Sequence, residues 1–264
     1  MAATVSVTMV RDAPRVGHNR GVNLTRAAAM ATLIAAGLAL AACATPAGGP
    51  SEAPSEPPTP TPAAETDAAT ELHAAWLDAG RAVAVVTYGS STCLPAVEDV
   101  QGEGSSVTVV ISEPEDGPCT MDYVPRATYI GLPAGVDIDD GLTVVVTGAF
   151  EGTVKLDDED DLTGTPGEST DYAPSAGWFD KTGFVVLTWG SSSCAPGVAS
   201  VEATGDEALA LTFADFPDDQ VCTMDMGPRV AVAAVSDGFG DEDDVELTLS
   251  GADISGTTTI LGDR

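Results

Sequence analysis

Residue types that carry catalytic chemistry are scarce in this sequence, and histidine is the scarcest. The 264 residues contain two histidines, His18 and His73. The serine pairs at 90–91 and 191–192 stand beside glycines, where hydroxyl groups commonly bond the backbone of a turn. We expect no Ser-His-acid or Cys-His arrangement around them, because His18 lies in the first segment of the chain and His73 at the end of the tether described below, before the first predicted strand. The sequence therefore argues against histidine-dependent hydrolysis.

Acidic residues are abundant, with 41 Asp and Glu against 10 Lys and Arg. Clusters at 137–140, 157–161 and 241–244 suggest a calcium ion, but none has the spacing of an EF-hand loop. We expect solvated acidic loops with no bound metal and no cofactor, and calcium is the alternative. Carboxylate pairs of the glycosidase type stay open as a second alternative, since acids occur throughout and none is set apart by an apolar context.

The charge also limits the partners. The formal net charge is −31, and it becomes −34 without the 42 residues before Cys43, which hold four arginines and one acid. Such a surface repels phosphate groups, so we expect no nucleic-acid partner and no direct contact with anionic lipid headgroups. Good solubility is the simplest explanation of the charge.

The first part of the chain has the organisation of an export signal. Arginines between positions 11 and 26 precede the uncharged, mostly apolar stretch 27–42, which is too short for a permanent membrane span of about 20 residues. The closing residues Leu40-Ala41-Ala42-Cys43 resemble the lipobox of bacterial lipoproteins. That resemblance implies removal of residues 1–42, a diacylglycerol thioether with its fatty-acyl (palmitate-type) chains on Cys43, and attachment to the extracytoplasmic face of the cell membrane. Translation starting at Met9 instead of Met1 would not change this.

A tether follows the lipidated cysteine. Residues 43–70 consist almost wholly of Ala, Pro, Ser, Thr, Gly and Glu and include seven prolines. With no apolar periodicity, this segment cannot bury a core, and we expect it to be disordered with polyproline character.

The rest of the chain repeats itself. Residues 88–95 and 189–196 share five of eight residues, and residues 119–126 and 222–229 share six of eight. The offsets are 101 and 103, so a unit of about 90 residues occurs twice. A repeat of this length is longer than a solenoid unit and large enough for its own core. We place the two copies at 71–156 and 173–264, with an acidic linker at 157–172.

Short, evenly spaced β-branched runs predict an all-β fold. In the first copy they cover 83–88, 106–112, 127–132 and 142–147, and in the second 184–189, 208–213, 230–235 and 245–249. Apart from a turn or two of helix near 70–77, no helical period is sustained. We therefore expect two tandem, small antiparallel β-sandwich or barrel domains.

Four cysteines remain after Cys43, one pair in each copy. Of the three connectivities that four cysteines allow, only Cys93–Cys119 with Cys194–Cys222 makes each repeat a complete unit, and this is the pairing we predict. Zinc is the rival interpretation, but structural zinc sites use closely spaced cysteine pairs with histidine, and the sequence contains none.

Four aromatic residues are candidates for recognition. Trp76 and Trp178 precede the first strand of their copies, while Tyr88 and Trp189 end it. Exposed rings would stack on sugars, but in domains so poor in aromatic residues we expect the rings to fill the core.

Two arginines occupy equivalent places in the repeats. Arg126 and Arg229 close the shared Cys-Thr-Met-Asp-x-x-Pro-Arg sequence. A guanidinium in this position either grips an anionic ligand or pairs with a carboxylate of its own domain. We favour the structural role, with Asp122 and Asp225, four residues upstream, as the candidate partners.

These observations favour a non-enzymatic, surface-tethered lipoprotein that binds an unknown envelope ligand or protein, or serves as a structural or interaction module. The alternative is a carboxylate-dependent envelope glycan hydrolase that works without histidine. A hydrolase needs two convergent carboxylates in a cleft, whereas a binding protein needs a shaped apolar or aromatic surface.

Overall fold

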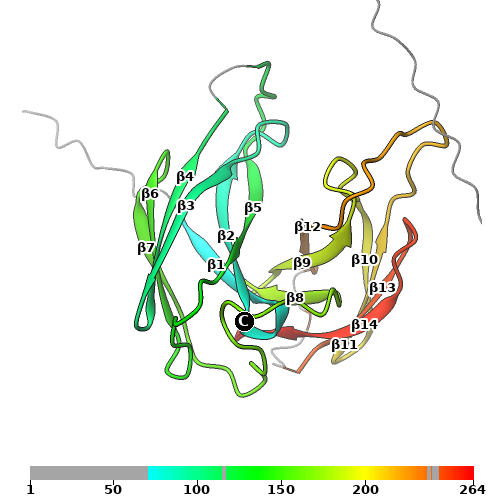
Figure 1. The fold of residues 1–264 in the computed structure, drawn as a ribbon. Coiled ribbons are helices and arrows are strands. Elements are labelled where there is room, and N and C mark those ends of the chain that lie inside the picture. The colour runs from blue at the N-terminus through cyan, green and yellow to red at the C-terminus, as the bar shows by residue number, and fades with distance from the viewer. Residues whose placement is uncertain (1–70, 115–116, 237–238, 240–243) are drawn as a thin grey trace, which may run out of the picture. The chain divides into compact units, whose positions relative to one another are not determined.

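A computed structural model describes residues 71–114, 117–236, 239 and 244–264, which all belong to one compact unit, Ala63–Arg264. The fold is all-β, as predicted (Figure 1). The predicted export signal, lipobox and tether lie outside the described residues, and so does most of the acidic cluster at 241–244.

All eight predicted strands are present, because their β-branched residues are buried in the pleated sheets. They are β2 (Ala82–Gly89), β4 (Ser106–Ser112), β5 (Val124–Gly131) and β6 (Leu142–Gly148) in the first repeat, and β9 (Gly183–Gly190), β11 (Ala208–Phe213), β12 (Gly227–Ala234) and β13 (Glu246–Ser250) in the second.

Six strands were not predicted. They are β1 (His73–Leu77), β3 (Ala96–Glu103), β7 (Gly152–Leu156), β8 (Ser175–Trp178), β10 (Val198–Gly205) and β14 (Gly256–Leu261). The helix expected near 70–77 is wrong: the segment is strand β1, followed by a single 3₁₀ turn, Asp78–Gly80. Its alanines favour a helix locally, but antiparallel pairing with β2 and burial between two sheets determine the observed conformation.

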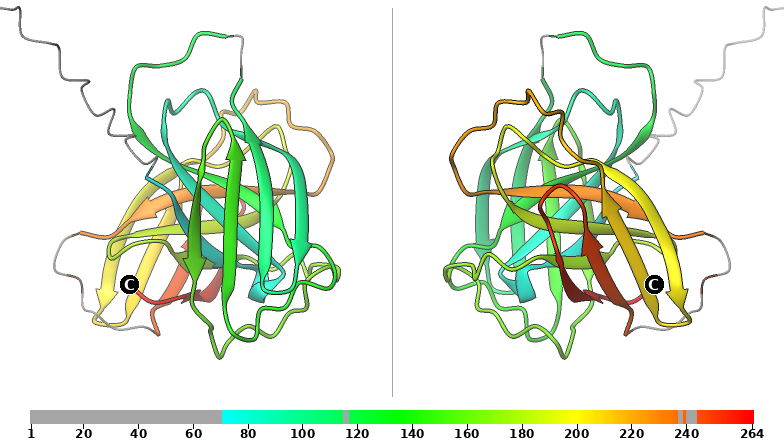
Figure 2. Two further views of the ribbon diagram at one scale, coloured as in Figure 1. Left: turned by 90° about the vertical axis from the view of Figure 1, so that its left-hand side faces the viewer. Right: turned by 90° about the vertical axis from the view of Figure 1, so that its right-hand side faces the viewer.

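The strands form four layers (Figures 1 and 2). In the first repeat they are β3-β4-β6-β7 and β1-β2-β5, and in the second β8-β9-β12 and β10-β11-β13-β14. Most pairs are antiparallel, while β4–β6, β11–β13 and β14–β8 are parallel. The β14–β8 pair joins the two layers of the second repeat into one seven-stranded sheet.

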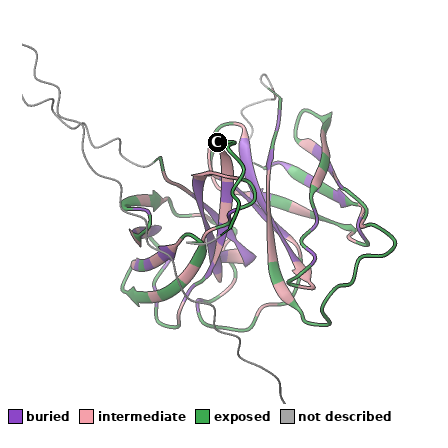
Figure 3. Cartoon of the chain, turned by 90° about the horizontal axis from the view of Figure 1, so that it is seen from above, coloured by how far each residue is buried: buried purple, intermediate pink, exposed green. Residues whose placement is uncertain are grey.

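Three apolar clusters fill the spaces between the layers. One lies inside the first repeat and includes Trp76 and Val144, and another lies inside the second and includes Trp178 and Leu247. The third joins the repeats, packing Ala84 and other residues of β1 and β2 against β9. Six consecutive residues of β2 are therefore buried, as are six of β9. Figure 3 shows buried strand segments in the middle of the described part of the chain. Two free-standing sandwich or barrel domains are not what the chain forms, because the layer between the repeats is itself a core.

The segment predicted as a linker also packs against the first repeat. The Trp76 indole N–H donates to the Asp157 carbonyl (2.9 Å), and the Gly164 N–H donates to the Ala79 carbonyl (2.8 Å). Arg81 forms an ion pair with Asp171 at 2.9 Å. These contacts fix residues 157–171 to the strand layers at the start of the first repeat.

The repeats approach each other closely where β1 and β8 meet. Gly177 on β8 corresponds to Ala75 on β1, and a Cβ at Gly177 would fall inside the contact distance of the Trp76 carbonyl oxygen. Gly177→Ala should therefore lower the free energy of unfolding by about 1 to 3 kcal/mol, the usual range for overpacking a core. Denaturant unfolding measures this change. Gly205→Ala is the matched control, because its Cβ would make only an ordinary contact with Ala208. Equal effects of the two substitutions would contradict close packing of the repeats.

Candidate functional site

The two predicted disulfides are present and anchor equivalent loops. Cys93 bonds Cys119, and Cys194 bonds Cys222, with Cα–Cα distances of 5.5 and 5.6 Å. They close loops of 26 and 28 residues, each worth about 3.5 kcal/mol on the chain-entropy model. Each repeat therefore presents a cross-linked loop beside the start of β5 or β12.

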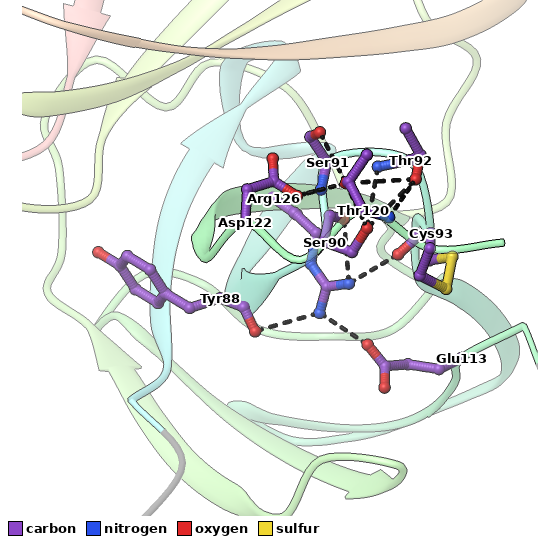
Figure 4. Close-up of polar contacts among 10 residues, drawn as sticks. Tyr88, Ser90, Ser91, Thr92, Cys93, Glu113, Thr120, Asp122 and Arg126 are labelled. Atoms are coloured by element: carbon purple, nitrogen blue, oxygen red, sulfur yellow. Dashed lines mark hydrogen bonds and ion pairs between the residues drawn. A yellow bond between two sulfur atoms is a disulfide. The ribbon is translucent and has the colours of Figure 1, made fainter.

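Arg126 ties the first loop to the sheet (Figure 4). Its guanidinium donates to the carbonyls of Cys93 (2.6 Å) and Tyr88 (3.2 Å) and pairs with Glu113 at 2.7 Å. The side chain passes so close to Gly89 that a Cβ there would lie 2.5 Å from Nη2. This contact explains why β2 ends in glycine.

Arg229 makes the same backbone contacts in the second repeat. It donates to the carbonyls of Cys194 (3.1 Å) and Trp189 (2.9 Å). The register of the strands makes Asp215 the counterpart of Glu113, but Asp215 accepts the Ala252 N–H (3.2 Å) instead. Within the described residues, Arg229 has no carboxylate within ion-pair distance, and burial lowers its pKa. The two arginines are therefore equivalent in position but not in charge compensation.

The predicted pairing of these arginines with Asp122 and Asp225 is wrong. Each aspartate instead accepts hydrogen bonds from the serine turn of its own loop. The Asp122 carboxylate accepts the Ser91 N–H (3.1 Å) and the Thr120 hydroxyl. These bonds, with the Ser91 hydroxyl contributing most, lower the pKa of Asp122 to about 2. The ionised carboxylate therefore supports the turn at pH values above its ordinary pKa of about 4. Protonation removes this support as the pH falls towards 2.

Asp225 plays the same part in the second loop. It accepts the Ser192 N–H (3.2 Å) and the Thr223 hydroxyl. Hydrogen bonds from Ser192 and Thr223 lower its pKa to about 2. The serine pairs act as turn residues, as the sequence indicated, and each aspartate holds one end of its disulfide loop.

Two of the four candidate aromatic residues are in the cores, where we expected all four. Trp76 and Trp178 are almost fully buried. Tyr88 and Trp189 are only partly buried. Tyr88 stacks on Tyr123, with ring centroids 5.6 Å apart, and Trp189 meets Tyr129 edge-on at 6.0 Å.

A groove of about 670 Å³ runs between the repeats, and equivalent segments of both form its walls. Its walls comprise one serine before the first cysteine of each loop, the four residues that follow that cysteine, and most of β5 and β12. The 21 lining residues are Ser91, 94–97 and 124–129 of the first repeat, and Ser192, 195–198 and 228–232 of the second. Most are Val, Ala, Pro or Leu, and none is acidic.

The loops beside the groove carry most of the exposed large apolar side chains. Seven such residues are exposed in the described part of the chain, and six of them lie on the two disulfide loops or in the short segments that follow the second cysteine of each loop. They are Leu94, Met121 and Tyr123 in the first repeat, and Val221, Met224 and Met226 in the second. The groove and its apolar surroundings therefore make a candidate binding surface in an otherwise acidic protein.

Sequence reasoning found the loops and the arginines but missed the groove. The walls come from four segments separated by up to about 140 residues, and only the contact between the repeats places them together. The one signal available was the duplication itself, since equivalent segments of a repeated chain tend to face each other across its interface.

Within the described residues, no group of three or more His, Cys, Asp or Glu is arranged to hold a metal ion. The same part of the chain has no helix of the length and hydrophobicity that a membrane crossing requires. No protein-family model, curated protein or solved structure matches the chain.

Proposed function

We propose that this protein is a surface-tethered lipoprotein whose two repeats together bind an apolar ligand in the groove between them. The lipid on Cys43 anchors the chain to the extracytoplasmic face of the cell membrane, and residues 44–70 hold the repeats away from it. The binding is not enzymatic and needs no cofactor.

The composition of the groove carries this proposal. Residues 43–264 contain 40 acids, yet none of the 21 groove residues is acidic. A volume of about 670 Å³ falls within the range of ligand pockets, roughly 300 to 1,000 Å³. Apolar lining favours removal of apolar ligand surface from water, and the surrounding acids disfavour anionic ligands.

The same observation disfavours the glycan hydrolase. Hydrolysis of that kind needs two carboxyl groups, about 5 to 9.5 Å apart, on either side of the bond that is cleaved. None of the described residues that line the groove carries a carboxyl group, and its two arginines are engaged by backbone carbonyls. Binding is therefore the function that the groove supports better.

A neutral dye tests the proposal. Nile red, whose fluorescence rises when water is excluded, should bind the purified full chain, and Ala195→Glu should weaken that binding about tenfold, or about 1.4 kcal/mol. Ala195 is exposed on the groove wall, and its equivalent is Leu94, so the position accommodates a larger side chain. A carboxylate there opposes apolar contact.

The matched control is Ala203→Glu, which changes another exposed alanine, on β10 and outside the groove. It should leave dye affinity unchanged. Equal affinity in the two variants would place the dye elsewhere and count against the groove as the binding site.

A further inference from the structure

Both strands that flank the groove are edge strands. Among the described strands, β5 pairs only with β2 and β12 only with β9, and each ends the strand order of its sheet. β5 and β12 lie beside each other where the repeats meet. An edge strand presents backbone N–H and C=O groups that have no partner strand.

The edges, not the faces, of these strands are turned towards the groove. Six consecutive residues of β5, 124–129, and five consecutive residues of β12, 228–232, line it. A strand that presented one face would contribute only every second residue, because successive side chains point to opposite sides. The consecutive lining therefore places main-chain groups of both strands along the groove walls.

Proline occupies the same place on both edges. Pro125 lies opposite Tyr88, and Pro228 lies opposite Trp189, at the end of each strand near the disulfide loop. Proline donates no hydrogen bond and protects an edge against unwanted pairing. Residues 127–129 and 230–232, which follow these prolines, keep their N–H groups. They are partly or wholly buried where the two repeats pack together.

We propose, resting on the binding function of the groove, that its ligand is an extended apolar peptide segment that adds as a strand to the edge of β5 or β12. Edge pairing supplies affinity through main-chain hydrogen bonds, and pockets for alternate side chains supply selectivity. The six lining residues of β5 span about 20 Å at the usual rise per residue. Because the edges of β5 and β12 are equivalent, the groove offers one peptide two similar binding sites.

The acidic surface around the groove favours particular residues at the two ends of the peptide ligand. Carboxylates are missing from the groove but abundant around it, as at Glu98 and Asp99 on the exposed side of β3 next to the lining residue Val97. A ligand with an uncharged centre and basic ends therefore matches both regions. Acidic ends would meet like charges.

Three peptide pools test this proposal by displacement of Nile red from the full chain. The first has six central positions drawn from Val, Ala, Thr and Tyr between pairs of lysines. The second has the same side chains but N-methylated central amides, so it cannot pair as a strand. The third has glutamates in place of the lysines. The first pool should displace the dye at a concentration at least tenfold lower than either of the others.

The outcomes separate this proposal from the one it rests on. If the first two pools displace the dye equally, or no pool displaces it, strand addition is wrong while the groove remains a dye-binding site. If Ala195→Glu leaves the affinity for Nile red unchanged, the proposed binding function of the groove is itself wrong. The full chain could instead form a dimer through β5 and β12. A doubled mass together with loss of dye binding at high protein concentration would show this, and the ligand of the groove would then be a second copy of the chain and not a peptide.

Discussion

Replacing Cys43 with alanine should abolish acylation and leave the protein either unprocessed or released from the membrane. The resemblance of residues 40–43 to a lipobox makes this thiol the proposed site of the diacylglycerol thioether. Two acyl chains anchor a protein stably, whereas one myristoyl chain binds only marginally. Loss of both should therefore move nearly all of the protein to the soluble or unprocessed fraction.

Metabolic labelling with a fatty-acid analogue, followed by fractionation, measures this result. Thr45→Ala, two residues beyond the proposed lipobox, should keep the label and the membrane attachment. A Cys43→Ala protein that is still labelled and still membrane-bound would refute the anchor.

Arg126→Ala should destabilise the fold more than Arg229→Ala, although the two arginines are equivalent in sequence. Arg126 is only 3% exposed and pairs with Glu113. Its removal leaves the carbonyls of Tyr88 and Cys93 without a donor. Because Glu113 is 43% exposed, the loss should fall towards the lower end of the range for broken buried pairs, at about 3 kcal/mol.

Arg229→Ala should cost about 1 to 2 kcal/mol, because it removes hydrogen bonds but no ion pair within the described residues. A loss of 1 kcal/mol lowers the melting temperature of a unit this large by about 2 to 4 °C, so thermal unfolding resolves the two variants. Glu113→Gln should reproduce only part of the Arg126 effect, since the carbonyl contacts remain. Equal losses at the two arginines would contradict the unequal charge compensation of the repeats.

The sequence predicted those strands that can be recognised from their own residues. β2 and β9 are rich in Val, Thr and aromatic residues, which favour a strand in isolation. The disulfides followed from one cysteine pair in each copy. β3 was missed because its sequence, with Glu98 and Asp99, is largely exposed and polar. Only its pairing with β4 makes it a strand.

The layered arrangement was beyond local patterns for a related reason. A strand buried on both faces has the same apolar composition whether its second neighbour is the other sheet of a sandwich or another repeat. Nothing in the residues of β2 distinguishes these two cases. The partner of Arg126 was misjudged similarly, because Asp122 is near in sequence, whereas the folded loop brings Glu113 and the carbonyl of Cys93 to the guanidinium.

The central claim, that the two repeats form one binding groove, is tested most directly by amide hydrogen exchange of the full chain with and without saturating Nile red. Binding should slow exchange at the amides of residues 124 and 126–129 of β5 and 229–232 of β12 together, and leave the outer strands β4 and β11 unchanged. Slowed exchange confined to one repeat, or to the exposed loop residues 121–123 and 224–226, would contradict a shared groove.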